Sequence, residues 1–416
     1  MSTEVRAPAL AAFRVRSFRF QWPSDLAASW AFEMETLILG WYVLAETGSV
    51  FLLTVFASLQ YVGTLLSPLI GVAGHRYGNR RVFCSMRAFY LILASTLTAL
   101  ALSDTLQALH VFVITGLMGL VRPSDLVIRH ALIGETLPVN QFVSAASISR
   151  TTQDSARVMG ALSGAGLVAW LGVGLAYVVV TAWYLASLLL TLGVAASTVP
   201  RNPASGAQTS VLHDLREGLT YVWRTPALQA GIWIALLVNL TAFPLVNGLL
   251  PHVAKSVYGT GQTGLGYLVA SFAGGALFGS LLLTRFGHAV RPGRVMIGGC
   301  LMWYVLTAAF AQMDTLAGGM LMLLLAGFAQ SLGMVTLAAL LLRVSAERLR
   351  SRVMGVRMLA IYTLPLGLLA AAPLIEAFGF RAMATAYCVV GLALTAWIGW
   401  HWRRAVWARE AAANQR

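Results

Sequence analysis

Long apolar runs separated by short polar segments repeat along this chain of 416 residues. A helix that crosses the hydrocarbon core of a bilayer needs about 20 mostly apolar residues. The pattern predicts an all-α membrane protein with twelve transmembrane helices, over residues 22–45, 50–73, 82–103, 107–131, 145–170, 174–197, 228–251, 263–284, 295–313, 316–342, 355–376 and 380–402.

The longest polar connection, residues 198–227, divides these helices into two groups of six. It opens with a flexible composition rich in Pro, Asn, Ser and Gly. Leu212, Leu215, Leu219 and Val222 then recur at helical spacing, which predicts an amphipathic helix on the cytoplasmic surface. We expect a cytoplasmic segment at 1–20, six-helix halves at 21–197 and 228–402, the linker with its surface helix at 198–227, and a cytoplasmic tail at 403–416.

Composition supports a membrane protein, because 58% of the residues are hydrophobic, only 11% are charged and the mean hydropathy is +0.75. A soluble protein carries about 25% charged residues. The formal charge of +14 comes from short arginine clusters that form no continuous basic face, so we expect no nucleic-acid partner. The cysteines Cys84, Cys300 and Cys388 lie in or beside apolar runs, which indicates buried thiols and no metal site.

Basic residues are distributed unevenly between the two sets of loops. With the N-terminus inside, 26 of the 29 basic residues fall in cytoplasmic segments, Lys255 and Arg381 fall outside, and Arg122 lies within a span. This asymmetry predicts that both termini are cytoplasmic. The first 20 residues hold four arginines and no long apolar stretch, so we expect no cleavable signal peptide.

The machinery of ATP hydrolysis is missing from the sequence. A phosphate-cradling loop needs Gly-Lys-Ser/Thr, and the sole lysine, Lys255, follows Ala254. We expect neither an enzyme nor a cofactor. Corresponding basic turns after the second and eighth runs, residues 75–81 and 285–294, are typical of a duplicated secondary transporter.

Four stretches resemble motifs of the major facilitator superfamily, in the branch of enterobactin exporters and macrolide efflux proteins. Gly71–Arg81 fits the loop G-x-x-x-D-R-x-G-R-R, and Trp41–Ser49 fits W-x-x-x-x-x-T-G-S. Glu347–Gly355 resembles the loop R-G-R-V-x-G before helix 11, and Leu215–Tyr221 is similar to the central surface helix of the branch. The resemblance implies two pseudo-symmetric six-helix halves of the major facilitator fold in a bacterial inner membrane.

Two departures from the family pattern affect what the resemblance implies. His75 replaces the loop acid that helps to latch the two halves, and Ala161 replaces the proline of the antiporter motif in helix 5. Gly160 and Gly164 in that motif would still permit close helix packing. We expect the basic loops to control the conformational cycle rather than substrate binding, through the residues Gly71, His75, Arg76, Gly78, Arg80, Arg81, Arg350 and Arg352.

Charged residues inside spans are costly and are functional candidates. Glu33 and Glu35 lie in helix 1, and about 200° separates their directions, so at most one can face a cavity squarely. Glu33 falls where the branch often places an acid. It is either a proton carrier or a structural partner of an arginine.

Helix 4 carries Arg122, Asp125 and Arg129, and the last two can pair because they are four residues apart. That pair could line the cavity or simply sit at the inner interface. We expect Glu33 and Arg122 to pair in one state of the transport cycle, with protonation of Glu33 freeing Arg122 for an anionic substrate group. A permanent structural pair is the alternative.

Neutral polar and aromatic residues complete the candidate cavity. Trp30 could stack on an aromatic substrate or belong to an interfacial belt, while Asn239 and Gln330 could line the cavity or join helices by hydrogen bonds. The working hypothesis is a monomeric, proton-coupled exporter of a small amphiphilic molecule, a siderophore or a drug, whose partners are that substrate, protons and the lipid bilayer. The alternatives are a lipid or lysolipid flippase of the same fold and a non-transporting membrane scaffold or sensor.

Overall fold

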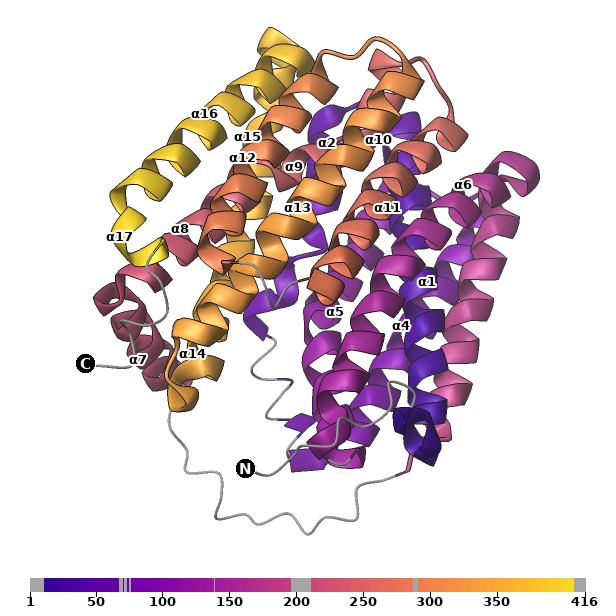
Figure 1. The fold of residues 1–416 in the computed structure, drawn as a ribbon. Helices are drawn as coiled ribbons and strands as arrows, with labels where there is room; N and C mark the ends of the chain where they lie inside the picture. The colour runs from indigo at the N-terminus through magenta and orange to yellow at the C-terminus, as the bar shows by residue number, and fades with distance from the viewer. Residues whose placement is uncertain are drawn as a thin grey trace. The chain divides into compact units, whose positions relative to one another are not determined.

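The computed structural model describes residues 11–66, 70, 73–74, 76–137, 139–195, 211–286 and 291–407 (Figure 1). Within these ranges the chain is helical and contains no strand. The main helices are α1 (Arg16–Thr47), α2 (Val50–Leu59), α4 (Asn79–Leu102), α5 (Ala108–Thr136), α6 (Val139–Leu192), α7 (Val211–Arg224), α8 (Pro226–Thr241), α11 (Gln262–Phe286), α12 (Pro292–Ala311), α13 (Leu316–Val344), α14 (Arg350–Leu359), α15 (Thr363–Phe378) and α16 (Phe380–His401).

Short helical pieces extend or join these helices. They are η1 (Ala11–Arg14), η2 (Val62–Leu66), α9 (Phe243–Asn247), α10 (Leu250–His252), the π-helix η4 (Val253–Val257), η6 (Glu347–Leu349), η7 (Ala360–Tyr362) and α17 (Arg403–Val406).

The twelve predicted spans correspond to these helices. Eight described helices are long and apolar enough to cross a membrane. α6 supplies two spans, because Gly172, with a φ of 75°, interrupts its helical backbone. A Cβ at Gly172 would meet no neighbour within 4 Å. α1 is 32 residues long but carries charges, and α2 with η2 and α8 with α9 and α10 form the remaining spans. The chain is therefore an all-α membrane protein of twelve spanning segments.

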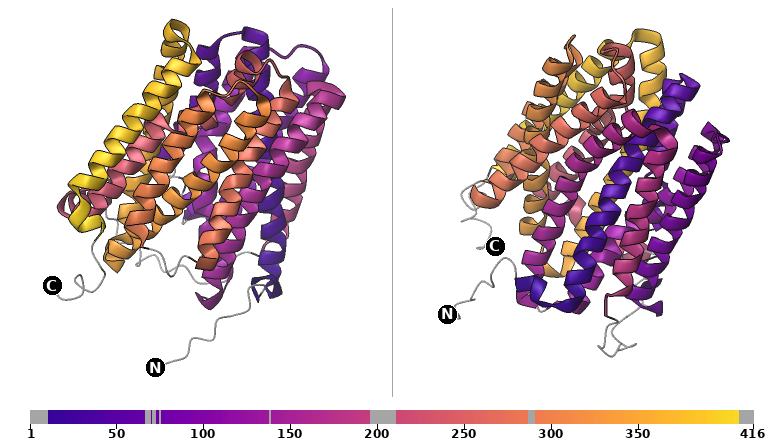
Figure 2. Two further views of the ribbon diagram at one scale, coloured as in Figure 1. Left: turned by 45° about the horizontal axis from the view of Figure 1, so that its top comes forward. Right: turned by 90° about the vertical axis from the view of Figure 1, so that its right-hand side faces the viewer.

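The residues form two compact units, one of residues 1–47 and 59–207 and the other of residues 48–58 and 208–416. In the first unit α1 lies along α6, and α4 and α5 pack beside them (Figure 2). Gly160 and Gly164 of α6 lie in the contact with α1, where an added Cβ would meet Glu33 Cβ at 2.7 Å and Met34 Cα at 3.1 Å.

In the second unit α13 packs against both α11 and α12, and α16 packs against α12 and α8. Glycines allow close approach here too: a Cβ at Gly327 of α13 would lie 2.0 Å from the carbonyl oxygen of Phe272 on α11. The helix predicted in the linker is present as α7, and it docks on α14.

Candidate functional site

A charged cavity of about 250 Å³ lies inside the first unit, between α1, α4, α5 and α6. It is lined by Ala28, Ser29, Phe32, Glu33, Arg87, Tyr90, Arg122, Asp125, Leu126, Arg129, Arg150, Gln153, Asp154, Arg157 and Tyr184. Five of these side chains are arginines and three are carboxylates. A charge at membrane depth needs a partner, so the pairing of each group determines what the cavity can do.

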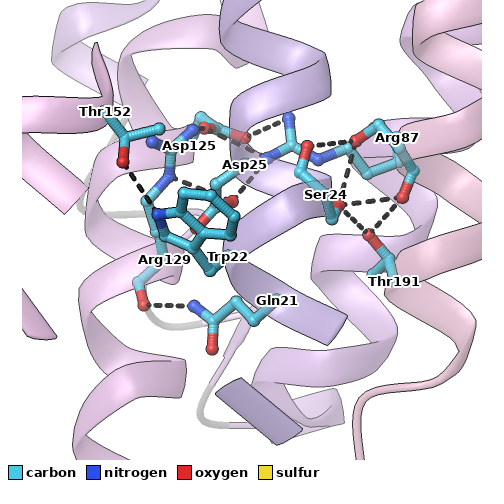
Figure 3. Close-up of polar contacts among 10 residues, drawn as sticks. Gln21, Trp22, Ser24, Asp25, Arg87, Asp125, Arg129, Thr152 and Thr191 are labelled. Carbon is cyan, nitrogen blue, oxygen red and sulfur yellow. Dashed lines mark hydrogen bonds and ion pairs between the residues drawn. The ribbon is translucent and has the colours of Figure 1, made fainter. Parts of the chain in front are cut away.

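Two arginines and two aspartates form a closed ion cluster at one wall of the cavity (Figure 3). Arg87 of α4 contacts Asp25 of α1 at 3.2 Å and Asp125 of α5 at 2.8 Å. Arg129 contacts the same two carboxylates at 3.2 Å and 2.7 Å. Because each charge has two opposite partners and the cluster is neutral, it ties α1, α4 and α5 together.

Polar side chains of α1 surround this cluster and hold the helix in place. Ser24 donates a hydrogen bond to the carbonyl oxygen of Ser187 at 2.8 Å, and the Trp22 indole donates one to Thr152 at 2.8 Å. The Gln21 amide donates to the carbonyl oxygen of Arg129 at 3.1 Å. Figure 3 shows these residues around the ion pairs, so the register of α1 against α5 and α6 is fixed on several sides.

Glu35 is buried behind the cavity with three donors. Tyr177 and Tyr184, both on the second part of α6, each donate a hydrogen bond of 2.8 Å to one of its carboxylate oxygens. The Arg122 guanidinium completes the group at 3.3 Å and lies over the Phe32 ring. With its side chain 3% exposed and all its donors fixed, Glu35 is a structural anchor for Arg122.

Glu33 has different surroundings, because it lines the cavity and pairs with a single arginine among the described residues. Its carboxylate lies 3.5 Å from Arg157 of α6, and the two side chains are 16% and 40% exposed. The expected pair of Glu33 with Arg122 is not formed in this structure, where Arg122 contacts Glu35 instead. The sequence offset explains the difference, since Glu33 and Glu35 point in nearly opposite directions from α1 and only Glu35 reaches Arg122.

The remaining candidates in the first unit are placed as follows. Asp154 pairs with Arg150 one turn away on α6 at 3.2 Å, at the edge of the same cavity. Trp30 stacks on Trp183 with ring centroids 5.2 Å apart, and its indole donates to Ser163 at 2.8 Å. This indole face is already occupied, which leaves the stacking of a substrate on Trp30 without support from the structure.

The two neutral candidates belong to the second unit and are not among the residues that line the charged cavity. Asn239 is half-buried on α8, and its amide donates to the carbonyl oxygen of Ala235 in its own helix at 2.8 Å. Gln330 is half-buried on α13. Their role in a substrate cavity stays a prediction.

The basic loop before α4 is partly described. Gly71 and His75 lie outside the described residues. Gly78 caps α4 with a φ of 102°, Arg76 and Arg81 are exposed, and Arg80 donates to the carbonyl oxygen of Leu192 at the end of α6 at 2.7 Å.

The basic loop before α14 is joined to the linker helix α7. Glu217 of α7 forms ion pairs with Arg352 and, at 3.5 Å, with Arg348. Tyr221 of α7 accepts a hydrogen bond of 3.2 Å from the backbone N–H of Ala346. Arg350 instead donates to the carbonyl oxygen of Leu342 at 3.1 Å.

Sequence reasoning missed several members of the site. Arg87 was counted with a cytoplasmic loop, although its side chain is 1% exposed inside the ion cluster. Tyr177 and Tyr184 carried no signal, because an isolated tyrosine in an apolar run is usually part of the core or the interface. Their spacing of seven residues, which places both hydroxyls on one face of a helix, was the available clue.

The geometry defines a polytopic helical membrane protein with a charged cavity in one of its units. The Major Facilitator Superfamily model matches residues 26–368. The chain belongs to this superfamily, so it is a transport protein and not an enzyme. Among the described residues, no group of three or more His, Cys, Asp or Glu side chains could hold a metal ion.

Two curated relatives are efflux proteins. The chain is 25% identical over 353 residues to the multidrug efflux pump Tap of Mycolicibacterium fortuitum, covering 82% of this chain and 85% of the relative. It is 20% identical over 278 residues to macrolide efflux protein A of Streptococcus pyogenes, covering 64% of this chain and 68% of the relative.

Solved structures share the fold. The nucleoside transporter NupG matches with a TM-score of 0.69 and 12% identity over 94% of this chain and 100% of its own. A bacterial homolog of the human lysosomal transporter Spinster matches with a TM-score of 0.70 and 15% identity, and the match covers 94% of this chain and 97% of the homolog. At these identities the likeness establishes the major facilitator fold alone.

Proposed function

We propose that this protein is a proton-coupled exporter of a small amphiphilic organic molecule, working by alternating access in a bacterial inner membrane. The observation that carries the proposal is the placement of Glu33, a carboxylate within a span that lines a cavity and has one weak arginine contact. The names of the two efflux relatives support export and a drug as substrate; a siderophore is the other substrate of similar chemistry.

Glu33 is the best proton carrier among the three acids that line the cavity. Asp125 contacts two arginines, and Asp154 is held by Arg150 of its own helix. Protonating Glu33 removes only one contact of 3.5 Å, whereas protonating Asp125 would leave two arginines short of a partner. Protonation of Glu33 therefore breaks fewer ion contacts than protonation of Asp125, and the contact that it breaks is longer than that of Asp154.

An exchanger requires that the proton and the substrate bind alternately. Charged Glu33 can accept a hydrogen bond from an N–H or O–H group of the substrate, and protonation weakens it as an acceptor. Substrate and proton then compete for one carboxylate. Substrate affinity should therefore rise with pH, because the deprotonated form of Glu33 binds the substrate.

The test uses proteoliposomes containing the full chain, a macrolide as substrate and a pH-sensitive dye in the lumen. Wild-type protein should move protons when the macrolide is added. Glu33→Gln should bind the macrolide more weakly, with an affinity that no longer rises with pH, and should not move protons, because the neutral amide resembles the protonated carboxyl and cannot exchange a proton. The matched control is Glu46→Gln, which removes the same charge from an exposed position near the end of the same helix and should behave as wild type.

Two results would count against the proposal. Normal transport by Glu33→Gln with unchanged pH dependence would exclude Glu33 as the proton carrier. Transport by the wild type without proton movement would exclude proton coupling itself.

A further inference from the structure

A second recess lies at the end of α16 in the second unit, and none of its residues lines the charged cavity. It has a volume of about 400 Å³ and is lined by Pro226, Trp400, His401, Trp402, Arg403, Arg404 and Ala405. We refer to this recess as the α16 groove. The transport mechanism does not use it.

The length of α16 places the groove at the depth of lipid headgroups. The helix has 22 residues and follows directly on Gly379, so it spans about 33 Å, close to the roughly 30 Å of a bilayer core. Tryptophan prefers the headgroup level. Trp397, Trp400 and Trp407 are 49%, 62% and 44% exposed at this end of the helix.

The groove carries positive charge with no carboxylate nearby in the elements that build it. α16 packs on α8 and α12, and α17 contacts α8. The corresponding stretches, residues 226–229, 292–297 and 397–407, contain Arg294, Arg403 and Arg404 and no Asp or Glu, and Arg403 and Arg404 line the groove. The N-terminus of α12 carries partial positive charge. It lies close to α17, since a Cβ at Gly293 would lie 2.2 Å from the Val406 carbonyl oxygen.

Aromatic contacts hold these cations at the groove. Arg403 lies over the Trp400 ring, 5.2 Å from its centroid, and donates to the Trp400 carbonyl oxygen at 3.3 Å. The Trp402 indole donates to Gln229 of α8 at 3.1 Å, which joins the groove wall to the start of that helix. The rings of His401, Trp397 and Trp402 contact one another, with the two tryptophan centroids 5.1 Å and 4.5 Å from that of His401 and 5.7 Å apart.

We propose that the α16 groove binds the phosphate of an anionic phospholipid headgroup. Basic pockets between spanning helices favour such headgroups, and the two arginines of the groove, which has no carboxylate among its described lining residues, attract an anion. An apolar stripe leads from the groove toward the bilayer centre: Val390, Leu394 and Trp397 lie on one face of α16 and are 48%, 44% and 49% exposed. Acyl chains can lie along this stripe while the phosphate contacts Arg403 and Arg404.

Native mass spectrometry of the full chain in detergent tests the assignment, with phosphatidylglycerol, phosphatidylcholine and inorganic phosphate as separate probes. Wild-type protein should retain phosphatidylglycerol in preference to phosphatidylcholine. The double variant Arg403→Gln/Arg404→Gln should bind phosphatidylglycerol about 30-fold more weakly, from the attraction of two arginines to an anionic headgroup. The control Arg76→Gln/Arg81→Gln removes two exposed arginines near the start of another span and should leave the affinity unchanged.

Each other outcome would overturn the assignment. Equal losses in both double variants would mean that the net charge of the protein, and not this groove, attracts the lipid. Equal binding of phosphatidylglycerol and phosphatidylcholine would remove the role of the headgroup charge. If inorganic phosphate binds as tightly as the lipid, the groove is a phosphate site without a lipid. Thermal unfolding of both double variants checks that each is folded.

Discussion

Two carboxylates on α1, Glu33 and Glu35, illustrate how much a shift of two residues changes in a helix. Glu35 faces α6 and is enclosed by two tyrosine hydroxyls and Arg122, whereas Glu33 faces the cavity and has only Arg157. A buried carboxylate with fixed donors stabilises the fold. Glu33 is half-buried with one long arginine contact, and on this the proposal that it carries the proton rests. The two acids therefore suit different tasks.

Glu35→Gln should destabilise the protein strongly, by about 3 kcal/mol, because it leaves the Arg122 guanidinium without a counter-charge. Removing both charges with Glu35→Gln/Arg122→Gln should recover much of that loss. Denaturant unfolding in detergent micelles measures both effects. If the double variant is no more stable than Glu35→Gln, the loss of stability in Glu35→Gln does not come from the unbalanced charge of Arg122. Glu33→Gln is the control and should cost less than 1 kcal/mol, in the range of exposed pairs.

Among the elements, the contact of α1 with α6 sets the geometry of the cavity. Gly160 and Gly164 of α6 bring the two backbones close at the level of Glu33 and Met34. The Glu33–Arg157 pair crosses the same contact about one turn away. Small residues allow such approach in membranes, where van der Waals packing drives association. Packing at the glycines should therefore affect the ion pair as well as stability.

Gly160→Ala should lower stability by about 1–3 kcal/mol and reduce transport, because the new Cβ would lie 2.7 Å from Glu33 Cβ and 3.2 Å from the Trp30 carbonyl oxygen. Gly166→Ala is a matched control on the same helix, since a Cβ there meets nothing within 4 Å. Thermal unfolding and macrolide transport report the two effects. If both variants lose transport to the same extent, the contact at Gly160 is not the cause.

The helices were predictable from the sequence because hydropathy is a local property. Even the division of residues 139–192 into two spans was expected, and Gly172 provides the break. The amphipathic helix of the linker was also predictable from its spacing. The ion partners were not. Whether Glu33 meets Arg122 or Arg157 depends on how far each helix is rotated and shifted, and residue spacing along one helix does not contain that information.

The contact between α7 and α14 gives a further prediction at this scale. Glu217→Gln should release α7 from the loop before α14, because Glu217 pairs with both Arg348 and Arg352. Hydrogen exchange of the amides in residues 215–224 should then be several-fold faster than in wild type. Glu347→Gln, at an exposed acid of the same loop, serves as the control. Unchanged exchange in Glu217→Gln would mean that Tyr221 and apolar packing hold α7 without the ion pairs.

At the scale of the whole molecule, the structure changes how the arginines are counted. Arg87, Arg129 and Arg157 were assigned to the cytoplasmic side, yet all three belong to ion pairs inside the first unit. Their charge is balanced by carboxylates, so they add little to the asymmetry between the loops. The exposed arginines of the basic loops before α4 and α14 remain in segments that are predicted to be cytoplasmic. The predicted orientation of the chain is therefore unchanged.

The orientation itself is tested by labelling single cysteines in intact cells. In a background of Cys84→Ser, Cys300→Ala and Cys388→Ala, His213→Cys on α7 and Ser256→Cys in η4 both place a thiol at an exposed position. The basic loops predict that the linker is cytoplasmic, so a membrane-impermeant maleimide should label Ser256→Cys and spare His213→Cys. Permeabilised cells should label both, which confirms that each thiol can react. Labelling of His213→Cys alone in intact cells would reverse the topology and place the exposed arginines outside.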